Sequence, residues 1–281
     1  MSALEKLDSL RRLLRDMDHV LVAYSGGVDS TFLLRVASEV LGDRTVALTV
    51  RSPTAADDEF ADAERYAHAF GVRHVIVDSN ELTIPGYAGN PIDRCYLCKG
   101  NLFVHCRAEA ARQGISQIVD GANLDDLRDY RPGLKAAAEH DVRHPLVETE
   151  LSKAEIRSLS QGLDLPTWDK PASPCLSSRF PYGTEITLDR LTQVGQAEKV
   201  LHRLGFAHCR VRFHEKIARI EVPAADVAKL ASEPVRTAIV EELKRLGFLY
   251  VTVDLQGFRS GSLNEALAED ANAPKQDRPA S

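Results

Sequence analysis

The sequence predicts an α/β protein, in which a parallel sheet covered by helices is followed by a smaller C-terminal α+β domain. Strand and helix patterns alternate over residues 1–165, which is typical of a parallel sheet with helices on both faces. A glycine-rich turn, Ser25-Gly26-Gly27-Val28-Asp29-Ser30, joins an apolar run to a helical pattern. Beyond a proline-rich stretch the order of elements changes, which indicates a second domain.

Apolar periodicity gives the individual elements. In the N-terminal part the expected strands are 20–24, 45–50, 74–78, 117–120 and 143–147, and leucines follow a helical spacing from Met1 to Asp18. The expected helices are 31–41, 55–70, 101–113, 134–140 and 153–162. In the C-terminal part we expect helices at 188–204, 225–231 and 235–246, and strands at 209–213, 217–222 and 249–254.

These elements divide the chain into four regions. We expect a nucleotide-binding domain over 1–165, a cysteine-bearing loop over 166–184, an α+β substrate-binding or oligomerisation domain over 185–267, and a disordered tail over 268–281. Four prolines exclude a regular helix or central strand from the loop. The loop is either a linker or a structured functional segment, and the Trp, Cys and Arg that it carries favour the second. We expect Trp168 to fill the core.

Composition restricts the classes of function. The net charge of −6 argues against a nucleic-acid partner. Neither a signal peptide nor a membrane-spanning segment is visible, so we expect a cytoplasmic protein. The five cysteines are expected to be thiols rather than disulfides in that compartment. Cys106 and Cys209 have no motif around them and are interpreted as small core residues.

The glycine-rich turn has the properties of a phosphate-binding loop. Gly26 and Gly27 let the backbone approach an anion, and the following helix directs free N–H groups at it. Ser25 and Ser30 add hydroxyl donors, and Asp29 can cap the helix or hold Mg²⁺. The lysine of a Walker A loop is absent at the required spacing. The alternative is an ordinary strand–turn–helix connection.

Asn and Asp residues gather after the fourth expected strand, from Asp120 to Asp126. Their carboxylates could bind Mg²⁺ at the same sheet edge as the glycine-rich turn. Asn and Asp are equally common in turns and helix caps, so the sequence leaves both interpretations open.

Three cysteines form a candidate metal centre. Cys95 and Cys98 make a Cys-x₂-Cys pair, and Cys175 lies in the proline-rich loop. Such a set can hold a metal centre. The alternatives are a zinc site completed by a residue such as His105, a dithiol redox pair, and unconnected thiols.

An arginine pair in the second domain is a candidate substrate site. Strand alternation directs Arg210 and Arg212 to one face, where guanidinium groups would suit a phosphate monoester. The next strand places Arg219 and Glu221 on a common face. The alternative is the solvent face of an amphipathic hairpin.

The glycine-rich turn resembles the PP-loop of the ATP pyrophosphatase superfamily, which implies an adenine nucleotide alpha hydrolase-like, Rossmann-like sheet and ATP with Mg²⁺. Adding Cys95-Tyr96-Leu97-Cys98-Lys99 and Pro174-Cys175-Leu176-Ser177-Ser178-Arg179 makes the chain similar to the LarE family of ATP-dependent sulfur transferases. That family adenylates a carboxylate of pyridinium-3,5-dicarboxylate mononucleotide and makes a thiocarboxylate for the nickel-pincer nucleotide cofactor.

The resemblance also implies roles for individual residues. Asp29 and Cys175 would be catalytic, and Cys95, Cys98 and Cys175 would hold a [4Fe–4S] cluster; otherwise Cys175 would surrender its own sulfur. Family members commonly form homo-oligomers. The residues that match the family's substrate site are Arg179, Glu198, Arg210, Arg212 and Glu221.

Two other classes of function stay open at this point. One is another PP-loop activity, either tRNA thiolation or amidation of the GMP or NAD synthetase kind. The other is a non-catalytic nucleotide or metal sensor. The acidic charge balance speaks against tRNA, and the chain has no room for a glutaminase domain.

Overall fold

A computed structural model describes residues 1–55, 57–128, 132–171 and 174–259. The chain divides into two compact units, the first formed by Met1–Leu176 with Glu185–Leu188, and the second by Ser177–Thr184 with the chain from Asp189 onward. The expected tail at 268–281 lies outside the described residues. Among the described helices, none has both the length and the apolar character needed to cross a bilayer.

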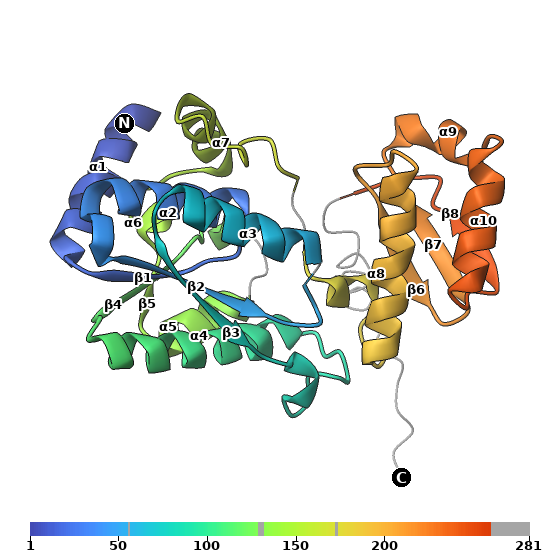
Figure 1. Cartoon of the computed structure of the whole chain (residues 1–281), viewed down its shortest axis with the longest axis horizontal. Helices are drawn as coiled ribbons and strands as arrows, with labels where there is room; N and C mark the ends of the chain where they lie inside the picture. The colour runs from blue at the N-terminus through green and yellow to red at the C-terminus, as the bar shows by residue number, and fades with distance from the viewer. Residues whose placement is uncertain (56, 129–131, 172–173, 260–281) are drawn as a thin grey trace, which may run out of the picture. The chain divides into compact units, whose positions relative to one another are not determined.

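The first unit is built on a parallel sheet, which confirms the predicted fold class (Figure 1). Its strand order is β3-β2-β1-β4-β5. The strands are β1 (Val20–Ala23), β2 (Thr45–Arg51), β3 (Arg73–Asp78), β4 (Gln117–Asp120) and β5 (Val142–Arg143). The helices are α1 (Ala3–Met17), α2 (Val28–Leu41), α3 (Asp57–Ala69), α4 (Arg94–Gln113), α5 (Pro132–Glu139), α6 (Pro145–Glu148) and α7 (Lys153–Gly162).

Strand alternation separates two cores, one on each face of this sheet. Val20 and Val22 of β1 pack with residues of α1, α2, α3 and α7, whereas Leu21 and Ala23 pack with α4 and α5. Figure 1 shows these two helical layers on opposite faces of the sheet. Because both faces are covered, β1 is apolar throughout, as expected for a central parallel strand.

Three sequence predictions for this unit are wrong. The fifth strand was expected at 143–147, but β5 ends at Arg143 because Pro145 starts helix α6, a position that suits proline. The helix expected from Asn101 begins at Arg94 and therefore includes Cys95 and Cys98. The expected burial of Trp168 is also wrong, since 39% of this residue is exposed.

The second unit contains a smaller sheet in the order β6-β7-β8. Strands β6 (Arg210–His214) and β7 (Ile217–Glu221) form an antiparallel hairpin, and β8 (Tyr250–Val253) pairs with β7 in parallel. The helices are α8 (Leu188–Arg203), α9 (Val227–Ala231) and α10 (Val235–Arg245). At the centre of its core the Phe213 ring lies 5.2 Å from Phe180 and 6.2 Å from Phe248, measured between centroids.

Short 3₁₀ helices complete the described secondary structure. They are η1 (Gly42–Arg44), η2 (Glu81–Thr83), η3 (Leu124–Arg128), η4 (Leu176–Arg179) and η5 (Ala224–Asp226).

Candidate active site

The glycine-rich loop follows β1 at the point where the strand order of the first sheet reverses. From β1 the chain continues to β2 and β3 on one side, while β4 and β5 lie on the other. The ends of β1 and β4 are adjacent, because Ala23 is in register with Asp120. In open α/β sheets, ligands bind at the carboxyl ends of the strands at such a reversal. The loop is therefore in the position of a ligand site.

Close packing explains why this loop is rich in glycine. Gly26 has a φ of +72°, and a Cβ there would lie 2.9 Å from the Cβ of Ala63 in α3. Gly27 is the N-cap of α2 and supplies no side-chain acceptor to the first N–H groups of the helix. The Ser25 and Ser30 hydroxyls lie 3.0 Å apart, Oγ to Oγ. The geometry is that of an anion-binding helix N-terminus with two hydroxyl donors beside it.

The carboxylate of Asp29 has one satisfied and one unsatisfied oxygen. Its Oδ2 accepts a hydrogen bond from Lys153 Nζ at 2.6 Å, while Oδ1 is buried and has no hydrogen-bond partner among the described residues. Burial raises the pKa of Asp29, and the positive charge of Lys153 opposes that rise. A buried, unpaired carboxylate oxygen at a phosphate-binding loop fits a hard divalent cation such as Mg²⁺.

The acidic loop after β4 makes turn and cap contacts. Asp125 Oδ2 accepts from the backbone N–H of Lys153 at 2.6 Å, and Asp126 Oδ2 accepts from the N–H of Asn123 at 3.0 Å. Gly121 lies so close to α2 that a Cβ would be 2.8 Å from the backbone nitrogen of Ser30. The hydrogen bonds agree with the turn interpretation of this loop, and the small size of Gly121 allows the loop to lie against the first turn of α2.

Two lysines at the glycine-rich loop were missed from the sequence. Lys153 begins α7 and pairs with Asp29, and Lys170 Nζ lies 3.1 Å from Asp62 Oδ2 and 3.4 Å from the carbonyl oxygen of Gly26. Arg157, one turn after Lys153, donates to the carbonyl oxygens of residues 168 and 170. No local motif marks these residues, because their partners are distant in sequence.

An ion pair at the end of β4 was missed as well. His144 Nδ1 lies 2.6 Å from Asp120 Oδ1. The hydrogen bond to Asp120 raises the pKa of His144 against the effect of burial; the negative charges of Asp120 and Glu148 also raise this pKa, and the positive charge of Lys99 lowers it. Burial would raise the pKa of Asp120, but His144 and Lys99 outweigh it and the pKa is lowered. The two shifts both favour the charged forms, in which His144 is protonated and Asp120 is ionised.

The ion pair predicts a pH-dependent stability. Because the pKa of His144 is raised, its contribution is complete below the ordinary histidine pKa of 6.5 and is lost as pH rises through the folded-state pKa. The Asp120 contribution is lost only as pH falls through its own lowered pKa. We expect His144→Gln to lower the free energy of unfolding more at about pH 6 than at about pH 9. Urea unfolding of both proteins checks this, and an equal loss at both pH values would contradict it.

The three candidate metal-binding cysteines lie in one neighbourhood of the first unit. The pKa of Cys98 is raised to about 12 by burial and then by the negative charges of Cys175, Glu81 and Cys95, opposed by Lys99. Cys98 and Cys175 carry free thiols. Within the described ranges, however, three or more His, Cys, Asp or Glu side chains never converge closely enough to hold a metal ion. The described side chains therefore do not by themselves identify a metal site at these cysteines.

The candidate substrate residues form a buried ionic cluster in the second unit. Arg179 makes two hydrogen bonds to Glu198, at 2.7 and 2.9 Å. Arg212 makes two to Glu221, at 2.9 and 2.8 Å, and Arg219 donates to Glu221 at 3.1 Å. Because Arg210 and Arg212 are only 5% and 3% exposed, the solvent-face alternative for this pair is excluded.

Arg210 differs from the other arginines of this cluster, because it has no carboxylate in salt-bridge contact within the described part of the chain. Its guanidinium lies over the ring of Phe258, 4.3 Å from the centroid. Burial, with the positive charges of Arg212 and Arg179, lowers the pKa of Arg210 to about 10. Glu221 and Glu198 oppose this shift without neutralising it. A buried guanidinium that has no carboxylate in direct contact is suited to bind an anion.

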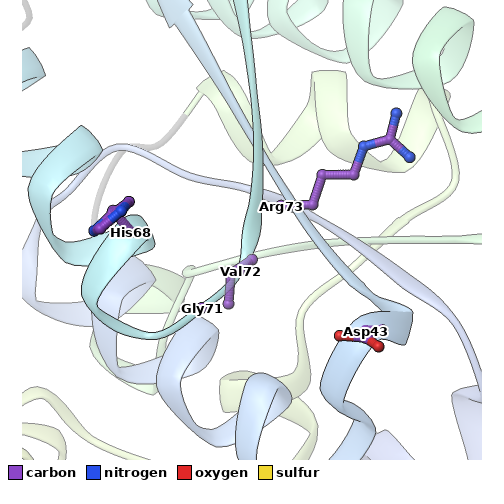
Figure 2. Close-up of a pocket in the computed structure, with 5 residues that line it drawn as sticks. All are labelled: Asp43, His68, Gly71, Val72 and Arg73. Carbon is purple, nitrogen blue, oxygen red and sulfur yellow. The ribbon is translucent and has the colours of Figure 1, made fainter.

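A surface hollow lies elsewhere on the first unit. Asp43, His68, Gly71, Val72 and Arg73 line it (Figure 2). Asp43 precedes β2 and Arg73 opens β3, so the hollow lies at the amino ends of these strands. It is therefore at the opposite edge of the sheet from the glycine-rich loop.

Comparison with known proteins identifies the superfamily to which the parallel sheet and its glycine-rich loop belong. The model of the asparagine synthase family matches residues 5–85, which include β1, the glycine-rich loop and α2. One chain of the glutamine-hydrolysing GMP synthase of Methanoregula boonei is 25% identical over 176 residues, 59% of this chain and 54% of that one. With the parallel sheet and the loop after β1, the match defines an ATP-dependent enzyme of the PP-loop superfamily.

Two relatives narrow the class to a family. The pyridinium-3,5-bisthiocarboxylic acid mononucleotide synthase of Lactiplantibacillus plantarum is 41% identical over 265 residues, which cover 94% of this chain and 95% of that protein. Protein slr1717 of Synechocystis sp. is 47% identical over 264 residues, 94% of this chain and 98% of that protein. The chain belongs to the LarE family, and the resemblance deduced from its motifs is confirmed.

Proposed function

We propose that the protein uses ATP to convert a carboxylate of pyridinium-3,5-dicarboxylate mononucleotide into a thiocarboxylate, a step in making the nickel-pincer nucleotide cofactor. The observation that carries the proposal is Asp29, whose unpaired oxygen lies in the PP-loop of a chain 41% identical to a pyridinium-3,5-bisthiocarboxylic acid mononucleotide synthase. The GMP synthase chain of Methanoregula boonei is 25% identical over 59% of this chain, against 41% over 94% for the bisthiocarboxylic acid mononucleotide synthase, which favours sulfur transfer over amidation. The match to a synthase over 94% of the chain also favours an enzyme over a non-catalytic sensor.

Adenylation is the first half of the proposed reaction. A carboxylate oxygen of the substrate attacks the α-phosphorus of ATP, the bond from that phosphorus to the bridging oxygen breaks, and pyrophosphate leaves. The N–H groups at the start of α2, with Ser25 and Ser30, bind the phosphates. Asp29 would hold Mg²⁺, which offsets negative charge on the departing pyrophosphate. The carboxylate becomes reactive because AMP is a good leaving group.

Sulfur transfer is the second half. The Cys175 thiolate attacks the carbonyl carbon of the adenylate and releases AMP, which leaves a thioester on the protein. Loss of the Cα proton and cleavage of the Cβ–S bond then release the thiocarboxylate and leave dehydroalanine at residue 175. A protein that uses this route turns over once.

A cluster held by Cys95, Cys98 and Cys175 would spare Cys175. We propose that these residues hold a [4Fe–4S] cluster, because a Cys-x₂-Cys pair and a third cysteine occur in a chain that belongs to the LarE family. When bound, such a cluster supplies an open iron site for an external sulfide. The donor chemistry fits, since thiolates are the usual ligands of iron–sulfur clusters.

Anaerobic purification followed by iron and acid-labile sulfide analysis tests the cluster. We expect about four of each per chain, lost on replacing any of these cysteines by alanine. The same protein with Cys106→Ala is a matched control, because Cys106 is also a residue of α4 but is fully buried in the core. Absence of iron and sulfide after reconstitution would leave Cys175 as a single-use donor, and zinc in their place would support the zinc alternative.

Arg210 is proposed to bind the phosphate of the mononucleotide, with Arg212, Arg179, Glu198 and Glu221 as the framework around it. Replacing Arg210 by methionine should weaken substrate binding about 10- to 100-fold, the range for hydrogen bonds to charged groups. Arg219→Met is the control, because Arg219 is paired with Glu221 and Asp254 and its side chain is 39% exposed. Calorimetric titration measures both, and an equal loss in the two variants would contradict the assignment.

The whole proposal is tested by incubating the protein with ATP, Mg²⁺ and the mononucleotide, with and without sulfide. AMP, pyrophosphate and a product in which sulfur replaces a carboxylate oxygen are expected, and mass spectrometry detects that exchange. The cytoplasmic location and the homo-oligomeric state stay predictions.

A further inference from the structure

We propose that Lys153 is a phosphate-binding residue of the ATP site, whose ammonium group contacts the β- or γ-phosphate of bound ATP and remains on pyrophosphate as it leaves. The inference rests on the proposed function, because it takes ATP to bind at the loop after β1. The inference adds Lys153, the first residue of α7, to that site; no sequence motif identifies this lysine.

The backbone fixes the position of Lys153 at the edge of the sheet. Ser152 caps α7 and forms a capping box with Glu155. The N–H of Lys153 donates to Asp125 Oδ2 at 2.6 Å, which ties the start of α7 to the loop after β4. The first residue of α7 is therefore held near the carboxyl ends of β1 and β4. A phosphate group bound at the glycine-rich loop would lie at the same place.

The side chain of Lys153 can move while its backbone is fixed. Its ammonium lies 2.6 Å from Asp29 Oδ2, and the side chain is 34% exposed, so the ion pair is not sealed from water. Four methylene groups separate the charge from the backbone, and lysine binds phosphate as a compact point charge without a fixed orientation. The ammonium can thus turn from a carboxylate to a phosphate nearby.

Charge balance around Asp29 gives the reason for such a move. The carboxylate also feels the negative charge of Asp126 and the positive charge of Arg157. A divalent cation bound to Asp29 would supply the positive charge that Lys153 provides in this structure. Two cations on one carboxylate repel, whereas the triphosphate brings new negative charge next to them. ATP with Mg²⁺ therefore favours transfer of the ammonium to the phosphates.

A second lysine, which pairs with the same helix, supplies a matched control. Lys6 Nζ pairs with Glu155 of α7 at 2.8 Å and donates to the carbonyl oxygen of Glu150. It ties α1 to α7 and has no contact with the glycine-rich loop among its described hydrogen bonds. The variant Lys6→Met therefore measures how loss of one ion pair on α7 affects nucleotide affinity when the groups at the glycine-rich loop are unchanged.

The test is calorimetric titration with Mg²⁺ and an ATP analogue that resists cleavage between the α and β phosphates, and separately with AMP. Lys153→Met should weaken binding of the analogue about 10- to 100-fold, as for loss of one hydrogen bond to a charged group. AMP affinity should stay within about twofold, because AMP lacks the β- and γ-phosphates. Lys6→Met should change neither affinity. Equal loss for AMP and for the analogue would overturn the proposal.

Repeating the titration in an Asp29→Asn background separates phosphate binding from neutralisation of Asp29. If Lys153 contacts phosphate, Lys153→Met still weakens analogue binding when residue 29 carries no charge. If Lys153 only neutralises Asp29, the second substitution has no effect, and the inference is wrong. Wild-type protein that fails to bind the analogue would overturn the proposed function too, whereas tight wild-type binding unchanged by Lys153→Met overturns this inference alone.

Discussion

Asp29→Ala is expected to reduce formation of AMP and pyrophosphate by about a hundredfold to a thousandfold, the range for losing one group that stabilises developing charge. The reason is the Oδ1 atom, which is buried in the PP-loop and has no hydrogen-bond partner within the described residues. Without Asp29, no carboxylate remains in the first turn of α2 to hold the cation on the departing pyrophosphate. Quantifying AMP and pyrophosphate over time measures the effect.

Asp16→Ala is the control for this prediction, because Asp16 is an exposed residue of α1. Circular dichroism should show that both variants fold. AMP formation at the wild-type rate by folded Asp29→Ala protein would remove Asp29 from the mechanism.

Cys175→Ala is expected to separate the two halves of the reaction. Adenylation depends on groups at the PP-loop, so AMP-linked substrate should still form. Sulfur transfer should fall below detection, because residue 175 supplies either the attacking sulfur or a ligand of the proposed cluster. Trapping the adenylate by rapid quench and measuring thiocarboxylate by mass spectrometry distinguish the two steps.

The buried Cys106 again gives a matched control, since Cys106→Ala removes a thiol from the core beneath α4 and leaves the three candidate ligands intact. It should retain both half-reactions. Full thiocarboxylate yield from Cys175→Ala would show that residue 175 neither donates nor positions sulfur.

The elements that have a clear local pattern of apolar residues could be predicted from the sequence. The central strands are recognisable because both faces of β1 are buried, so an uninterrupted apolar run is required. The strand expected at 143–147 is wrong because so short a segment, Arg143-His144-Pro145-Leu146-Val147, fits a strand or a helix equally well, and Pro145 begins a helix. The sequence predicts too late a start for α4 because Gly100 and Asn101, two weak helix formers, interrupt the helical pattern between Arg94 and Gln113.

The candidate site was predictable only where its residues are contiguous. Ser25 to Ser30 form one loop, so their chemistry is visible in the sequence. The partners of Asp29 and Gly26 are Lys153 and Lys170, which lie 124 and 144 positions away. Such contacts are set by packing between elements and leave no local pattern.

Burial of the arginine cluster shows the same limit. Strand alternation places Arg210 and Arg212 on one face, but it does not determine whether that face meets water or other side chains. The structure buries this face with Glu221 of the neighbouring strand and Glu198 of α8. Only the ionic partners, supplied by other elements, make burial of these guanidinium groups tolerable.

The most direct test of carboxylate activation is to follow oxygen from the substrate. Pyridinium-3,5-dicarboxylate mononucleotide with heavy oxygen in its carboxylates is incubated with the protein, ATP, Mg²⁺ and sulfide, and the released AMP is analysed by mass spectrometry. If the carboxylate is adenylated and sulfur then displaces AMP, one heavy oxygen appears in the phosphate of AMP for each thiocarboxylate formed. Unlabelled AMP alongside thiocarboxylate would contradict adenylation of the carboxylate.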